Sequence, residues 1–391
     1  MMIFRLAMKN ILGAGLRTWL NIFILSLSYF VIIALQGLYV GWQDDASREM
    51  KNWDFAGGQY WQETYDPYDP FTLEESHATI PEDLQKLIAN GEAISILFSP
   101  ATIYTDGRMR NIVLKGIEPS QNLIELPTNF LTDSDGEINC IIGSGFADNL
   151  NIKEGDYIVL RWRDKNGTYD ACDLKVAHIF STTVITVESN QVWISLSILQ
   201  EMLGLPNEGT IITVKDEKYK KEFFSWQHKD LDFLLLDLTK MIKAKTIGSS
   251  IMYMLMLFLA MLAIFDTQVL SIFRRRKEMG TMMALGMTRL KIIQLFTLEG
   301  VLHAVLAILM GAVYGIPLLS HFEKVGMKIG MDAKEWGLSG LDDALYPVYG
   351  WKLVFGTIVL VLIIVTIVSF LPTRKIAKLK PTDALRGKMT K

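Results

Sequence analysis

Three ionisable side chains lie inside long apolar runs of this sequence, where a charge is costly and indicates a function by default. Glu299 and His303 are four residues apart, so they occupy one face of a helix, and Asp266 lies two helical turns before a cluster of arginines. Such groups can relay protons or contact a substrate. Hydrogen bonds between helices, or water near the cytoplasmic interface, explain them as well. The sequence leaves both interpretations open.

Common signatures of catalysis are absent from the sequence. It has no GxxxxGK[ST] nucleotide loop, no HExxH and no CxxC pair, and its five histidines are scattered. We therefore expect no catalytic centre, no metal site and no cofactor, and any nucleotide must be hydrolysed by another subunit. Cys140 and Cys172 each lie in a strand-like run, so they form either a disulfide in an oxidising compartment or two buried free thiols.

A basic, amphipathic segment, Ile272–Lys291, lies between two long apolar runs. Its three arginines and one lysine at 274–277 should end the first run at the cytoplasmic face. Methionines then recur at roughly helical spacing, Gly286 can end that helix in a left-handed conformation, and Thr288 can cap the next helix. The pattern predicts a helix, a sharp turn and a second helix at the membrane surface. Spacing alone is also compatible with a solvated connector.

Length and composition place the chain among integral membrane proteins. It has 391 residues, half of them apolar, and its mean hydropathy is positive. Four runs are long enough to cross a hydrocarbon layer of roughly 30 Å as helices. The expected divisions are a cytoplasmic amphipathic helix at 1–18, spans at 19–42, 246–273, 292–320 and 348–371, an extracytoplasmic domain at 43–245, a cytoplasmic segment at 274–291, a short outer loop at 321–347 and a cytoplasmic tail at 372–391.

The net charge of −3 conceals a strong asymmetry along the chain. Residues 1–18 contain three basic and no acidic residues, 273–291 contain six and one, and 372–391 contain seven and one. Residues 43–245 contain 19 basic and 33 acidic residues. By the positive-inside rule both termini and the basic segment are cytoplasmic, and the acidic segment is outside. The first apolar run is too long for a typical signal peptide, so we expect an uncleaved anchor.

The long acidic segment has the signals of an α+β domain. Asp106-Gly107 and Asn166-Gly167 each separate two strand-like runs, which predicts two hairpins. Helical patches around 81–90, 146–150 and 195–203 interrupt the strands. An aromatic cluster near its start either lines a route for an apolar cargo or contacts a partner, or it packs within the domain or at the lipid interface. Its members are Trp53, Tyr60, Trp61, Tyr65, Tyr68 and Phe71.

The third apolar run carries Gly311 and Gly315 at GxxxG spacing, which lets another helix approach closely.

The run from Ile264 to Gly300 resembles the FtsX-like permease signature. The matching positions are Asp266, Thr267, Glu278, Gly280, Ala284, Leu285, Gly286, Thr288, Arg289 and Glu299. The closing residues LPTRKIAKLKPTDALRG are similar to the family's C-terminal motif at Pro372, Ala377, Leu379, Pro381, Ala384, Leu385 and Arg386. The four-span layout with a large first outer loop resembles the macrolide-exporter and lipoprotein-releasing permeases.

The resemblance implies a non-catalytic ABC transporter permease of the bacterial cytoplasmic (inner) membrane. A separate cytoplasmic ATPase would push the basic segment, and movement of the outer domain would export or extract a lipophilic cargo: a lipoprotein, a lipid or an amphiphilic compound. The alternative is a signal transmitter that activates an outer-face enzyme such as a cell-wall hydrolase. Expected partners are the ATPase, a second permease chain in a homodimer or heterodimer, membrane lipid and an outer-face partner, with no nucleic acid. The resemblance assigns coupling to Arg274, Arg275, Arg276, Lys277, Glu278, Gly280, Met282, Met283, Gly286, Thr288 and Arg289.

Overall fold

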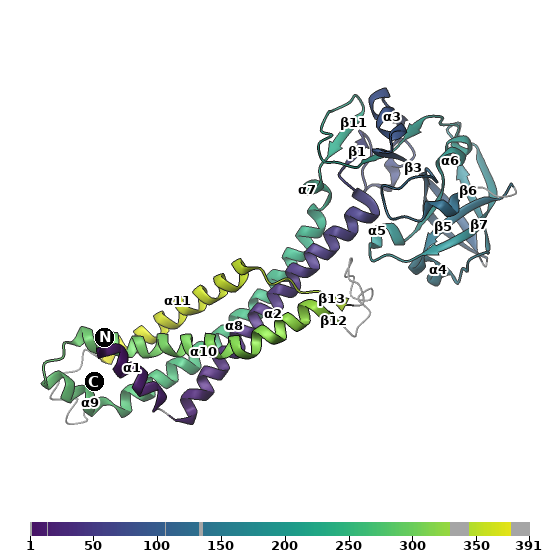
Figure 1. The fold of residues 1–391 in the computed structure, drawn as a ribbon. Coiled ribbons are helices and arrows are strands. Elements are labelled where there is room, and N and C mark those ends of the chain that lie inside the picture. Colours follow the sequence, from purple (N-terminus) through teal and green to yellow (C-terminus); the bar gives the residue numbers. More distant parts are fainter. Residues whose placement is uncertain (1, 14, 106, 133–135, 329–343, 377–391) are drawn as a thin grey trace. The chain divides into compact units, whose positions relative to one another are not determined.

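The protein was analysed as a computed structural model that describes residues 2–13, 15–105, 107–132, 136–328 and 344–376 (Figure 1). Two compact units make up the chain. The membrane unit contains the chain up to Trp42, Met241–Lys328 and the part from Ala344 onward, and the outer domain contains Gln43–Lys240. Most of the expected outer loop, at 329–343, and the tail from Ala377, with its family motif, lie outside the described residues.

Helices dominate the membrane unit, and four described helices are long and apolar enough to cross a membrane (Figure 1). The four apolar stretches are Thr18–Phe55, Leu236–Leu259, Arg289–Val325 and Trp351–Arg374. The helices themselves are α1 (Met2–Leu12), α2 (Leu16–Met50), α8 (Leu236–Arg274), α9 (Arg276–Ala284), α10 (Arg289–Val325) and α11 (Trp351–Ile376), with a short pair of strands, β12 (Met327–Lys328) and β13 (Ala344–Leu345).

The core of the membrane unit lies where α1, α2, α10 and α11 meet. Ile11 of α1, Leu25 of α2 and Leu295 of α10 are among its fully buried side chains. Gly311 and Gly315 lie where α10 passes α2: a Cβ atom at these positions would be 3.5 Å from Ser26 O and 3.4 Å from Phe30 Cδ2. The expected close approach of another helix at this GxxxG motif is therefore confirmed.

A nine-stranded sheet forms the frame of the outer domain, in the order β11-β1-β10-β3-β4-β8-β5-β7-β6. An additional pairing of β6 with β3 closes six of these strands into a barrel. The strands are β1 (Gln59–Gln62), β3 (Ala93–Thr105), β4 (Arg108–Ile117), β5 (Ile138–Gly143), β6 (Tyr157–Arg163), β7 (Tyr169–Phe180), β8 (Gln191–Ser195), β10 (Ile211–Val214) and β11 (Trp226–Lys229); β2 (Ala78–Thr79) pairs separately with β9 (Glu208–Gly209).

The predicted hairpins and helices of the outer domain are confirmed. β3 pairs with β4 across a turn containing Gly107 (φ +72°), and β6 pairs with β7 across a turn containing Gly167 (φ +83°). The three helical patches are α3 (Glu82–Ala89), α4 (Ser144–Leu150) and α6 (Leu196–Leu203). Strands and helices thus mix in one domain inserted between the first and second spans, as the α+β prediction requires.

Apolar cores cover both faces of the sheet. One fills the barrel and contains Leu114, Ile142 and Leu160, all fully buried. A second lies on the other face and contains Phe98 and Trp193. Successive residues of a strand point to opposite faces, so each long strand contributes to both cores.

Candidate functional site

The basic segment after α8 folds as a short helix between two long ones. α8 ends at Arg274, and α9 begins at Arg276 after a break at Arg275, which has φ −96° and ψ 13°. α10 is capped by Thr288, whose Oγ1 accepts a hydrogen bond from Lys291 N at 3.5 Å. The predicted helix, turn and second helix are confirmed.

A glycine ends α9 in the conformation expected from the sequence. Gly286 has φ +93°, which strains any residue with a Cβ atom. The N–H of Gly286 donates to Met283 O at 3.1 Å, and the N–H of Met287 donates to Met282 O at 2.9 Å. These are the two bonds of a Schellman cap, so the turn is held by backbone groups rather than by side chains alone.

The two faces of α9 have different environments. Met282 packs partly buried against the core of the membrane unit, and Met283 and Met287 pack against Ile292 and Phe296 of α10. Gly280 is buried as well. The exposed residues around this helix, which we call the α9 surface, are Glu278 and Thr281 of α9, Leu285 at its C-terminal end and Arg289 at the start of α10.

Leu285 is the prominent apolar group on the α9 surface, with 83% of the residue exposed. Arg274, at the end of α8, is exposed too, whereas Arg276 and Lys277 lie in the first turn of α9. The predicted coupling residues thus extend from the end of α8 through α9 to the start of α10.

A buried carboxylate joins three elements beside α9. Glu299 of α10 is 4% exposed, and its Oε1 accepts hydrogen bonds from Arg275 Nη1 at 2.9 Å and from Asn10 Nδ2 of α1 at 2.7 Å. The Arg275 Nε donates to Glu278 Oε2, also at 2.9 Å, and the guanidinium carbon lies 5.1 Å from the centre of the Phe296 ring. We call Arg275, Glu299 and Asn10 the Arg275 joint.

The charged partners of Arg275 outweigh the effect of burial on its pKa. Burial would lower the pKa of Arg275, but the hydrogen bond to Glu278 and the charge of Glu299 raise it above the ordinary value. Arg275 therefore keeps its charge in the joint.

His303 lies on the same face of α10 as Glu299, as the spacing predicts. Its Nδ1 is 2.6 Å from the backbone oxygen of Glu299, and the side chain is buried. Asp266 lies on α8 with an exposed side chain. For Glu299, hydrogen bonding between helices is what the structure shows.

The two cysteines are free thiols, so the alternative of a disulfide is not realised. Cys140 of β5 is paired with Val176 of β7, four residues along that strand from Cys172. That offset is about 13 Å at 3.3 Å per residue, and a disulfide requires Cα atoms within about 7 Å. Burial raises the pKa of the Cys172 thiol to about 11, so the thiolate is disfavoured.

Most of the aromatic cluster packs inside the outer domain. Trp53 stacks on Phe180 with ring centres 5.8 Å apart, and Trp61 meets Tyr65 edge to face at 5.2 Å. Tyr60 is buried. Tyr68 and Phe71, by contrast, are exposed. Packing within the domain is therefore the outcome for the first four aromatic residues.

A lysine occupies a core position that sequence analysis did not single out. Lys115 of β4 is 7% exposed, and its Nζ lies 4.4 Å from the centre of the Phe98 ring and 4.7 Å from that of Trp193. Burial lowers the pKa of Lys115 to about 8, although the charge of Asp54 acts in the opposite direction. The signal was present in the alternation of Val113, Lys115 and Ile117 on one strand face.

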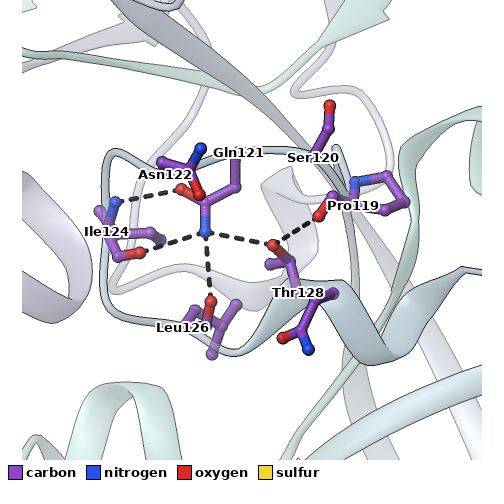
Figure 2. A pocket seen from close by; sticks show the side chains of 8 residues that line it. Pro119, Ser120, Gln121, Asn122, Ile124, Leu126 and Thr128 are labelled. Carbon is purple, nitrogen blue, oxygen red and sulfur yellow. Dashed lines mark hydrogen bonds between the residues drawn. The ribbon is translucent and has the colours of Figure 1, made fainter.

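A pocket of about 400 Å³ opens on the loop after β4, and Figure 2 shows its lining. The Gln121 side chain braces this loop: its Nε2 donates to the backbone oxygens of Ile124 and Leu126, and its Oε1 accepts from the N–H of Ile124. None of the eight lining residues is charged. Its polar groups mainly hold the loop together.

Within the described ranges, no group of three or more His, Cys, Asp or Glu side chains is arranged to hold a metal ion.

The sequence singles out Glu299 but not its contact with Asn10, because the partners of Glu299 come from elements far apart in the sequence. Asn10, one turn from Ala7 on the buried side of α1, was the available signal.

The C-terminal part of the chain is similar to a known family of permeases. Residues 250–381 match the family model for the FtsX-like permease C-terminal domain. The chain is 28% identical over 283 residues to an uncharacterized ABC transporter permease of Methanocaldococcus jannaschii, and the match covers 66% of this chain and 64% of that relative. Among solved structures, the extracellular domain of the noncanonic ABC-type transporter YknZ from Gram-positive bacteria matches with 14% identity and a TM-score of 0.29, over 44% of this chain and 99% of that one.

Proposed function

We propose that this chain, which carries an FtsX-like permease domain and is homologous to an ABC transporter permease, is the membrane subunit that links a separate cytoplasmic ATPase to its outer domain. ATP binding and hydrolysis by that ATPase would move α9, and the outer domain would export or extract a lipophilic cargo. The membrane is the bacterial inner membrane, with both termini in the cytoplasm. A second permease chain, identical or different, completes the complex.

The observation that carries the proposal is the contrast between the two faces of α9. One face is anchored by methionines within the membrane unit, while the α9 surface displays Leu285 beside the charged Glu278 and Arg289. An exposed apolar anchor with a charged rim is typical of the centre of a protein interface. The ATPase is the partner that this surface fits, because the positive charge of the flanking segments supports a cytoplasmic position for α9.

Continuity of the helices supports transmission of movement across the membrane. α8 is one helix from Leu236 to Arg274, and it begins directly after the short helix α7 (Leu231–Leu234) of the outer domain. A helix transmits a displacement along its axis because each turn is fixed by backbone hydrogen bonds. A push on α9 would therefore reach the outer domain through α8.

The packing of α9 identifies Leu285 as a sharper probe than the methionines. Met282 and Met283 belong to the coupling segment, but a glutamate at either position would place a charge against α10 and disturb the fold. Leu285→Glu changes a side chain that faces solvent. Its effect can therefore be assigned to a partner.

The test is to purify the chain gently with the ATPase that accompanies it and to measure the mass of the complex by native mass spectrometry. Leu285→Glu should lower the amount of bound ATPase at least tenfold. Leu16→Glu is the matched control, because Leu16 is 80% exposed at the start of α2, outside the coupling segment. It should bind ATPase like the unchanged chain.

The molecules that co-purify with the complex distinguish extraction of a cargo from activation of an outer-face enzyme. Two permease chains, two ATPase chains and an additional lipid or lipoprotein mass support extraction of a cargo. The same complex bound to a soluble enzyme of the outer face would instead support signalling. If the unchanged chain carries no ATPase, the proposal is wrong.

A further inference from the structure

The Arg275 joint lies at the point where the coupling segment meets the rest of the membrane unit. Arg275 is the residue between α8 and α9, with backbone angles in a sparsely populated region, so it marks the break between the two helices. Its guanidinium donates in two directions, to Glu278 within α9 and to Glu299 of α10. One side chain thus connects the start of α9 to a different span.

Glu299 extends this connection to the N-terminal helix. Its Oε1 also accepts from Asn10 Nδ2, so α1 and the break between α8 and α9 are held by the same buried oxygen atom. Glu299 lies ten residues into α10, which is about 15 Å along the helix at 1.5 Å per residue. The joint therefore reaches from Glu278 at the α9 surface to a buried position well inside α10.

The residues around the joint are apolar, so apolar side chains could pack in place of the ion pair. Phe296 and Ile292 are buried beside it, and Leu295 and Leu302 of α10 belong to the core of the unit. A buried ion pair in such a setting is weak evidence for stability, because apolar side chains of similar volume often serve as well. Directional hydrogen bonds do fix the orientation of one element on another, which apolar contacts alone do not.

We propose that the Arg275 joint transmits movement of α9 into α10 and α1, so that three elements respond to the ATPase and not α8 alone. Arg275 and Glu299 are positioning residues: they act through the elements that they hold and do not touch the ATPase. This inference rests on the proposed function. It adds a second route for the movement, through the third span.

The two ion pairs of Arg275 differ in their exposure to water. Glu278 is exposed, and its bond to Arg275 exchanges readily with water or with a group of the ATPase. The Glu299 side chain is 5% exposed, so its bond to Arg275 is retained when α9 moves. A displacement of α9 that carries Arg275 with it must therefore pull on Glu299, and through it on α10.

The experiment uses the full chain in complex with its ATPase in lipid nanodiscs. Hydrogen exchange is measured by mass spectrometry with and without ATP under conditions that block hydrolysis. In the unchanged chain, ATP should alter exchange in α1 and in the part of α10 around Glu299 as well as in α9. Bound ATPase and ATP hydrolysis are recorded for each variant.

Three variants separate transmission from folding. Glu299→Gln keeps an acceptor oxygen but removes the charge. The pair Arg275→Met with Glu299→Leu replaces the joint by apolar groups and is expected to fold. The reversed pair Arg275→Glu with Glu299→Arg restores the charges in the opposite order.

Relative to the amount of ATPase that it binds, the apolar pair should show an ATP-dependent change in α10 and α1 that is at least fivefold smaller. Glu299→Gln should show an intermediate loss, and the reversed pair should recover most of the response. A full response of α10 and α1 in the apolar pair would overturn the inference. So would an unchanged chain that binds ATPase but shows no response in α10, and that result would leave the proposed function intact. An unchanged chain that binds no ATPase would overturn both.

Discussion

Two basic side chains, the half-buried Arg275 of the membrane unit and the buried Lys115 of the outer domain, are stabilised in different ways. Arg275 of the membrane unit donates to two carboxylates at 2.9 Å, and its pKa is raised. Lys115 of the outer domain lies over two aromatic rings, and burial lowers its pKa to about 8. The difference teaches that burial alone does not decide the state of a charge. Carboxylates at hydrogen-bond distance stabilise the charged form of Arg275. At Lys115, two ring faces and the charge of Asp54 do not fully offset the effect of burial on the pKa.

Removing the carboxylate from the first site should have the largest effect. Glu299→Leu leaves the partly buried Arg275 with only the exposed Glu278 as a charged partner, and loss of the buried partner destabilises by about 3 to 5 kcal/mol. The measurement is thermal unfolding in nanodiscs, followed by tryptophan fluorescence. Combining Glu299→Leu with Arg275→Met should recover most of the lost stability. If the double replacement is no more stable than Glu299→Leu, the charge is not the cause.

Removing the charge of Lys115 should stabilise the protein, whereas Glu299→Leu should destabilise it. Lys115→Met removes an ammonium whose pKa is lowered from 10.5 to about 8, a shift that corresponds to roughly 3 kcal/mol. Part of that gain is offset by loss of the attraction to the rings, so we expect stabilisation of about 1 to 3 kcal/mol at pH 7. Urea unfolding followed by fluorescence measures it.

The pH dependence provides the control for the lysine. The native state releases the Lys115 proton at lower pH than the unfolded state, so between the two pKa values the unfolded state binds more protons. The stability of the unchanged chain therefore rises as pH increases from about 8 to 10.5. The advantage of Lys115→Met should be full below pH 8 and shrink across this window. An advantage independent of pH would mean that packing, and not charge, explains it.

Local signals in the sequence predicted much of the coupling segment. A glycine that ends a helix and a threonine that caps the next depend on backbone geometry within a few residues, so Gly286 and Thr288 could be assigned from sequence alone. The outer hairpins follow the same logic at Gly107 and Gly167. Closure of the barrel by pairing of β6 with β3 could not be predicted, because these two strands are far apart in the sequence.

Lys115 and Arg275 show where sequence reasoning fails. A lysine on a strand is ordinarily placed in solvent, and only the second apolar core on the outer face of β4 turns Lys115 inward. Arg275 was one of four consecutive basic residues, and nothing in that run distinguishes it from Arg274. The partners that do so come from α1 and α10. Tertiary contacts, which the local pattern does not contain, decide both cases.

Replacing the guanidinium of Arg275 by an ammonium tests what the shape of the charged group contributes. Arg275→Lys keeps the positive charge but lacks the planar fork, so it should lose the bond to Glu278 and the contact with Phe296 while retaining Glu299. We expect a loss of about 1 to 2 kcal/mol in the unfolding assay. Arg274→Lys is the matched control, because Arg274 is exposed, and it should change stability by less than about 0.5 kcal/mol.

The smallest effect should come from the other carboxylate on the same guanidinium. Glu278 and Glu299 both lie 2.9 Å from nitrogen atoms of Arg275, yet the Glu278 side chain is 61% exposed and that of Glu299 is 5% exposed. Exposed ion pairs contribute about 0.2 to 1 kcal/mol and are screened by salt, so Glu278→Gln should cost at most a few tenths of a kcal/mol. Unfolding at low and high ionic strength measures both the loss and its screening. A cost for Glu278→Gln as large as that for Glu299→Leu would show that distance, and not burial, governs these pairs, and the comparison between the two units would lose its physical basis.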